Sequence, residues 1–138
     1  MPSGINALYA NTFYECEQLE CITQTESVSF IDDEVFFGCK KLISLRFADN
    51  LTSVGFRSFA RCISIKEIYL GNSLSYIKAN AFMDCENLKN IILPKTLEEI
   101  GEGAFDGCKS MISIEIPHQV FVLPPFAFAN CSKLSKIL

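Results

Sequence analysis

Six cysteines recur at a constant interval of 23 residues along this 138-residue chain. They stand at Cys16, Cys39, Cys62, Cys85, Cys108 and Cys131. A spacing without deviation indicates that one structural unit is repeated, because a compact domain with an irregular core has no reason to keep a single period. We therefore expect one domain of six 23-residue units without a linker, covering residues 1–23, 24–46, 47–69, 70–92, 93–115 and 116–138.

Other apolar residues repeat with the same period as the cysteines. Aliphatic residues or methionine fill the positions eight before, three after, six after and twelve after each cysteine, and Gln24 interrupts an apolar column eight after it. A phenylalanine stands three residues before every cysteine, at Phe13, Phe36, Phe59, Phe82, Phe105 and Phe128. One short unit cannot bury its own apolar face, so stacked neighbours must bury it together, and each column becomes a ladder of like side chains.

Local periods predict the elements within each unit. Residues 88–93 (Leu-Lys-Asn-Ile-Ile-Leu) alternate inward and outward as a strand does, and Pro94 ends the strand because it cannot donate to a ladder. The segment from Ala104 to Cys108 places Phe105 three residues before the cysteine, which suits one short helical or 3₁₀ turn. We expect a repeat solenoid with a parallel β-sheet on its concave face and short helical turns and extended segments on the return side.

The pattern L-x-x-I-x-(I/L)-P-x-x-(V/L)-x-x-I-x-x-x-A-F-x-x-C resembles the BspA-like leucine-rich repeats. Its clearest copy spans residues 88–108, and all six units fit the register. The departures are local, such as the Pro124-Pro125 pair in the last unit. The resemblance implies a right-handed leucine-rich-repeat superhelix and a role in protein recognition or adhesion, at a cell surface or after secretion, without a defined reaction.

Charge and hydropathy argue against several classes of function. With a formal charge of −4, the chain lacks the excess of lysine and arginine that is typical of nucleic-acid-binding proteins. No apolar run approaches the roughly 18 residues of a membrane span. No charged-then-apolar signal peptide stands at the start, so we expect either an intracellular chain or one from which the signal segment has been removed. Both ends carry apolar repeat positions instead of polar caps, so we expect a continuation into further repeats or end-to-end self-association.

We expect no catalytic, cofactor-binding or metal-binding residues. Free cysteine is among the residue types buried most often, so the cysteine column is predicted to be a reduced, buried ladder, with disulfides between adjacent units as the alternative. Zinc requires closely spaced ligand pairs, and only Cys16 and Cys21 are close. Cys21 is expected on the solvent side of a strand. The single histidine, His118, falls in a variable polar turn, so nothing points to Cys–His chemistry.

Candidate binding residues lie on the outward side of the predicted strands. Inward positions are fixed by packing, whereas outward positions vary between units and are free for recognition. Tyr69 and Ile92 would form an apolar centre with a charged rim, which is the usual makeup of a protein interface. The predicted contact residues on the concave face are Arg46, Glu67, Tyr69, Asn90, Ile92 and Glu115. A second surface on the convex side would arise if the aromatic residues outside the core columns are exposed, namely Phe30, Phe56, Tyr76, Phe121 and Phe126.

These features favour a non-catalytic protein-binding or adhesion module that uses the concave sheet surface to hold a protein partner. The alternative is an intracellular leucine-rich-repeat scaffold or regulatory subunit. Seven cysteines without an obvious pairing fit a reducing compartment better, because oxidising compartments tend to pair or remove free thiols.

Overall fold

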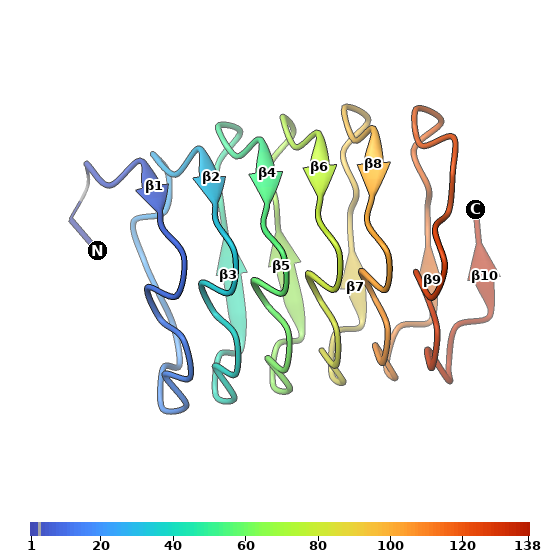
Figure 1. Ribbon diagram of the computed structural model, residues 1–138, viewed down its shortest axis with the longest axis horizontal. Coiled ribbons are helices and arrows are strands. Elements are labelled where there is room, and N and C mark those ends of the chain that lie inside the picture. The colour runs from blue at the N-terminus through green and yellow to red at the C-terminus, as the bar shows by residue number, and fades with distance from the viewer. Residues whose placement is uncertain (3) are drawn as a thin grey trace.

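The computed structural model describes residues 1–2 and 4–138. The chain winds into a β-solenoid of about six turns, here called coils, which stack along one axis (Figure 1). Residues that lie beside each other in adjacent coils are 23 apart in the sequence, as in the pairs Leu8–Ile31 and Ile77–Ile100. The expected solenoid with parallel sheets is confirmed.

Five two-residue strands form a parallel sheet on one side of the coils, here called the β1 sheet. Its strands are β1 (Ala7–Leu8), β2 (Phe30–Ile31), β4 (Ser53–Val54), β6 (Tyr76–Ile77) and β8 (Glu99–Ile100). In every strand the second residue is buried and the first is partly or fully exposed. The return side of each unit, predicted to be extended or irregular, therefore contributes a strand to this sheet. Its aliphatic column packs inward, and its backbone pairs with that of the next coil.

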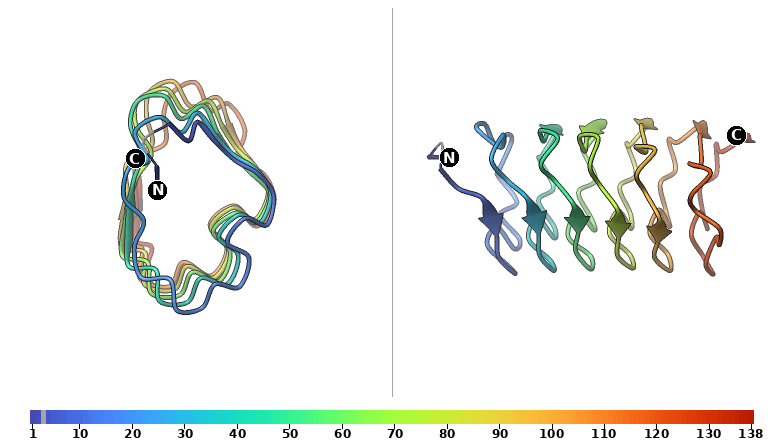
Figure 2. Two further views of the ribbon diagram at one scale, coloured as in Figure 1. Left: turned by 90° about the vertical axis from the view of Figure 1, so that its left-hand side faces the viewer. Right: turned by 90° about the horizontal axis from the view of Figure 1, so that it is seen from above.

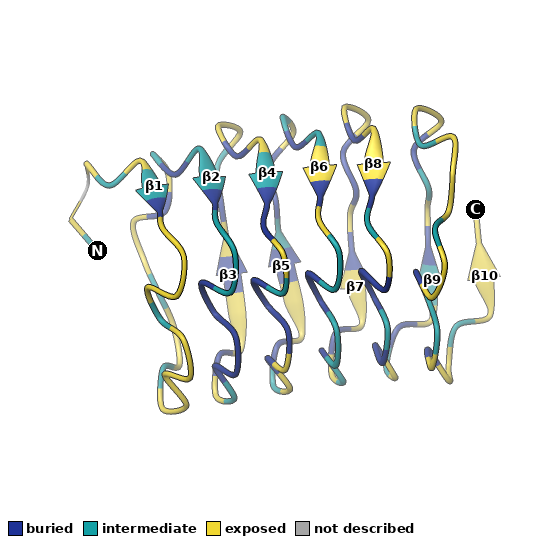
Figure 3. Ribbon diagram, viewed as in Figure 1, coloured by how far each residue is buried: buried dark blue, intermediate teal, exposed yellow. Residues whose placement is uncertain are grey.

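The opposite side of the coils carries the strands that the alternating pattern predicts (Figures 1 and 2). The β3 sheet comprises β3 (Ser44–Arg46), β5 (Glu67–Tyr69) and β7 (Asn90–Ile91), and the β9 sheet comprises β9 (Ser113–Ile114) and β10 (Lys136–Ile137). All pairs are parallel. Leu45, Ile68 and Ile91 point into the core, and their neighbours in each strand face solvent (Figure 3).

Consecutive turns replace the short helical turns expected before each cysteine, and no helix occurs in residues 1–2 and 4–138. The backbone is left-handed five residues and one residue before each cysteine, as at Gly103 and Gly107, so no helical run can extend through the segment. The amides of Glu34, Phe36 and Gly38 donate to carbonyls of the next coil. Alternate amides therefore tie neighbouring coils together here as well.

The phenylalanine ladder forms the centre of the core. Adjacent rings are stacked with centroids 5.1 to 5.5 Å apart and planes within 13° of parallel. Phe36, Phe59, Phe82 and Phe105 are fully buried, whereas Phe13 and Phe128, in the first and last coils, are only partly buried. Each inner ring thus has an aromatic neighbour on both faces, and each outer ring has one.

The cysteine column is a ladder of hydrogen-bond donors. The carbonyl of Phe59 accepts the amide of Cys62 at 3.1 Å and the thiol of Cys85 at 3.1 Å. The same thiol bond, 3.1 to 3.3 Å long, recurs from Cys39 through Cys131. A carbonyl has two acceptor lone pairs, and cysteine supplies the second donor without adding bulk to the core.

Burial changes the acidity of these thiols. Desolvation raises the pKa of Cys39 from 9.0 to about 12, and it raises the pKa of Cys62, Cys85, Cys108 and Cys131 as well. The prediction that all six column cysteines are buried is wrong for Cys16, which is exposed because no described coil stacks on its outer side. The buried ladder therefore holds neutral thiols at neutral pH.

Candidate binding face

The outward side of the β3 sheet places five of the six predicted contact residues together. Glu67 lies between Ser44 and Asn90 in adjacent strands, and Arg46 lies opposite Tyr69. Ile92 follows β7 and is 75% exposed. Because these positions alternate with the buried residues Leu45, Ile68 and Ile91, the inward and outward assignment made from the sequence agrees with the observed burial.

Tyr69 is held in one orientation by its neighbours. The Arg46 guanidinium lies 4.1 Å from the centroid of the Tyr69 ring, a cation–π contact. The Asn72 side-chain amide donates to the Tyr69 hydroxyl at 3.3 Å and to the Asp49 carboxylate at 3.0 Å. A pre-oriented, half-buried aromatic side chain loses less rotamer entropy on contact with a partner than a free one does.

An open groove of about 920 Å³ runs over this face. Arg46, Glu67, Tyr69, Asn90 and Ile92 line it. Glu115, the sixth predicted residue, is exposed but does not line the groove. Glu115 follows β9, which belongs to the separate β9 sheet, so the predicted row is divided where the hydrogen-bonded sheet ends.

Sequence reasoning missed the other wall of the groove, residues 21–26. Gln24 has a left-handed backbone and is exposed, and Thr25 takes the buried place instead and donates its hydroxyl to the Arg46 carbonyl. This local shift turns the chain away from a strand and leaves Cys21, Thr23 and Glu26 lining the groove. The sequence signal for this departure is the interruption of the apolar column at Gln24.

Residues considered for chemistry are not gathered at this face. Cys21 is exposed, as predicted, and lines the groove, whereas His118 is exposed in a turn of the last coil and does not line it. Among residues 1–2 and 4–138, no group of three or more histidine, cysteine, aspartate or glutamate side chains is placed to hold a metal ion. The described part of the chain also contains no helix long and apolar enough to cross a membrane.

The chain belongs to the BspA type leucine-rich repeat family. The model of the BspA type leucine-rich repeat region matches residues 6–135 in six copies. This agrees with the resemblance seen in the 23-residue pattern. A comparison with curated proteins finds no match.

Three solved structures share the fold. They are a leucine-rich repeat protein of T. pallidum (TM-score 0.78), one of Bacteroides ovatus ATCC 8483 (TM-score 0.73) and the pneumococcal vaccine antigen PcpA (TM-score 0.75), each 24% identical. The similarity covers 98%, 97% and 99% of this chain, but only 58%, 41% and 31% of those chains. The chain therefore spans about a third to three fifths of these structures.

Proposed function

We propose that the chain is a non-catalytic recognition module that binds a protein partner through the outward side of the β3 sheet. The observation that supports this most directly is the groove, in which a pre-oriented tyrosine and an exposed isoleucine lie side by side at equivalent positions of adjacent coils. Aromatic anchors beside apolar residues, surrounded by polar groups, carry most of the energy of typical protein interfaces.

The polar rim of the groove indicates how a partner would be selected. Glu26, Asp49 and Glu67 line the groove, and among the described residues that line it Arg46 is the one cationic side chain, already placed over Tyr69. A partner with a basic rim around an apolar centre would match this distribution of charge. Such complementarity acts mainly on association rate and specificity, and the Tyr69–Ile92 centre would supply the affinity.

The proposed partner could be bound at a cell surface, in an adhesive role. The similarity to a vaccine antigen among the solved structures supports this form of the proposal. An intracellular scaffold would use the same face, and the compartment of the bound partner distinguishes the two roles. Membership of a leucine-rich repeat family favours binding over a reaction in both cases.

The test compares face variants with a matched variant elsewhere. Candidate extracellular and intracellular proteins would be tested for binding by biolayer interferometry with the wild-type chain and with Tyr69→Ala and Ile92→Ala. Ile112→Ala serves as the control, because Ile112 is 54% exposed and lies outside the groove. Each of the two substitutions on the face should raise the Kd for a partner about thirtyfold or more, as expected for an interface hot spot. A partner that tolerates both face changes but not the control would exclude this face.

A further inference from the structure

The last coil separates from the β1 sheet, and this leaves the edge of strand β8 open. In the preceding coils the amides of Lys78 and Gly101 donate to the carbonyls of Val54 and Ile77. The equivalent residue of the last coil is Pro124, which has no amide hydrogen to donate to Ile100. Within residues 119–124, all of them described, only Val120 donates to a backbone carbonyl, and it does so inside its own turn.

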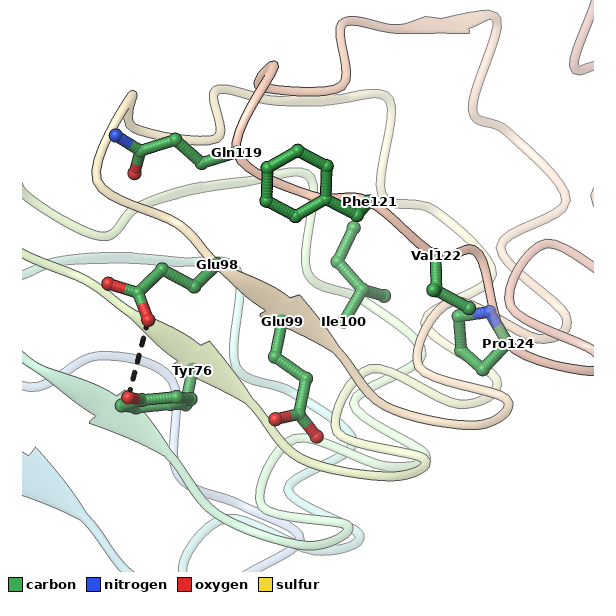
Figure 4. Close-up of a pocket in the computed structure, with 8 residues that line it drawn as sticks. All are labelled: Tyr76, Glu98, Glu99, Ile100, Gln119, Phe121, Val122 and Pro124. Carbon is green, nitrogen blue, oxygen red and sulfur yellow. Dashed lines mark hydrogen bonds between the residues drawn. The ribbon is translucent and has the colours of Figure 1, made fainter.

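A cleft of about 700 Å³ lies where the sixth strand of the β1 sheet would be expected. Figure 4 shows its lining, which combines β8 with the opposing chain of the last coil, and Tyr76 from the neighbouring strand β6. The lining residues are Tyr76, Glu98, Glu99, Ile100, Gln119, Phe121, Val122 and Pro124. Its lining comes from strands β6 and β8 and from the last coil, so the cleft lies between two neighbouring coils instead of on the outer end of the stack.

The chemistry of the cleft is apolar on one wall and acidic on the other. Phe121 is 90% exposed and Val122 is 71% exposed, although both face a recess that an apolar side chain could fill. Glu98 accepts a hydrogen bond from the Tyr76 hydroxyl at 3.4 Å, and Glu99 is exposed beside it. Within the part of the chain that the structure describes, the lining includes two carboxylates and no lysine or arginine.

We propose that this cleft binds an extended peptide segment of a partner protein, carrying lysine or arginine alternating with apolar residues, as a parallel strand added to β8. The open carbonyls of Glu98 and Ile100 would accept alternate peptide amides, as in known cases of strand addition. Apolar side chains would pack on Phe121 and Val122, and basic side chains would pair with Glu98 and Glu99. This site is on the opposite side of the coils from the β3 sheet and does not depend on it.

The first experiment is an NMR titration of the chain with a short capped peptide in which lysine and valine alternate. Saturable amide shifts should appear in β8 and in residues 119–124. The same peptide with glutamate in place of lysine should not bind. Methylation of the amides along one edge of the peptide should abolish binding, whereas methylation along the other edge should be tolerated, because only one edge donates to β8.

A charge variant provides the second arm. The double change Glu98→Gln and Glu99→Gln should weaken the affinity for the lysine peptide about tenfold. The control is the double change Glu15→Gln and Glu20→Gln, which removes the same charge from the first coil and should leave the affinity unchanged. Shifts confined to the β3 sheet, equal binding of the glutamate peptide or full affinity of the double variant would overturn the proposal. So would concentration-dependent dimers that compete with the peptide, because a second copy would then be the occupant.

Discussion

Replacing Phe82 by alanine is the most direct test of the stacked core. Phe82 is fully buried, and its ring stacks on Phe59 at 5.2 Å and on Phe105 at 5.3 Å. The loss of transfer free energy is about 2 kcal/mol. A residual cavity of roughly 100 Å³ would add about 2.4 kcal/mol. With an unfolding entropy near 0.3 kcal/mol/K for a chain of this size, a total of about 4 kcal/mol corresponds to a fall in Tm of about 14 K.

Two matched variants give this prediction its discriminating power. Phe128 stacks on one ring only and is partly buried, so Phe128→Ala should cost about half as much. Tyr69→Ala, on the surface, should cost about 1 kcal/mol or less. Urea unfolding followed by far-ultraviolet circular dichroism measures all three changes. Equal losses for Phe82→Ala and Phe128→Ala, or a larger loss for Tyr69→Ala, would refute the ladder.

Three further predictions follow from individual contacts. Cys85→Val should be more destabilising than Cys85→Ala in urea unfolding, since it removes the same thiol donor and also adds bulk to a filled column. Burial raises the folded-state pKa of the buried thiols, so above about pH 9 these thiols ionise only in the unfolded chain. The free energy of unfolding should therefore fall as pH rises from about 9. A pH series of melting curves measures this fall, which should be less steep in Cys85→Ala. Gly71→Ala should lower the Tm and Gly4→Ala should not, because a methyl at Gly71, which has a left-handed backbone, would overlap the Ala48 carbonyl, whereas nothing lies near Gly4.

The repeated columns are sufficient to predict the solenoid, the buried rows and the face of the β3 sheet. Each column has a direct packing meaning, since the same position in every coil meets the same surroundings. The inward placement of Leu45 and Ile68 and the outward placement of Arg46 and Tyr69 followed from alternation alone. Whether these outward residues bind a partner remains a proposal that the variants above test.

Features that depend on the pairing of distant residues were not predictable from local periods. A strand of two residues such as β8 has no alternation long enough to detect, and its pairing with β6 joins residues 23 apart. Glycines at the left-handed positions Gly103 and Gly107 were a signal for turns, but in other coils most of those positions hold other residue types, such as Glu34, Arg57 and Phe126. The cleft beside β8 accompanies the missing amide of Pro124, the residue equivalent to those that pair with the preceding coil elsewhere in the stack, and a local period carries no information on such pairing.

The thiol–carbonyl bonds and the ring stacks have a consequence for how such a chain reaches its native state. Phenylalanine contacts join residues 23 apart and thiol bonds join residues 26 apart at every junction between adjacent coils, wherever the junction lies. The absolute contact order therefore stays constant as coils are added, and each new coil requires closure of a loop of the same length as the last. A stack of this kind can nucleate at any pair of coils and grow in either direction without a growing entropic barrier.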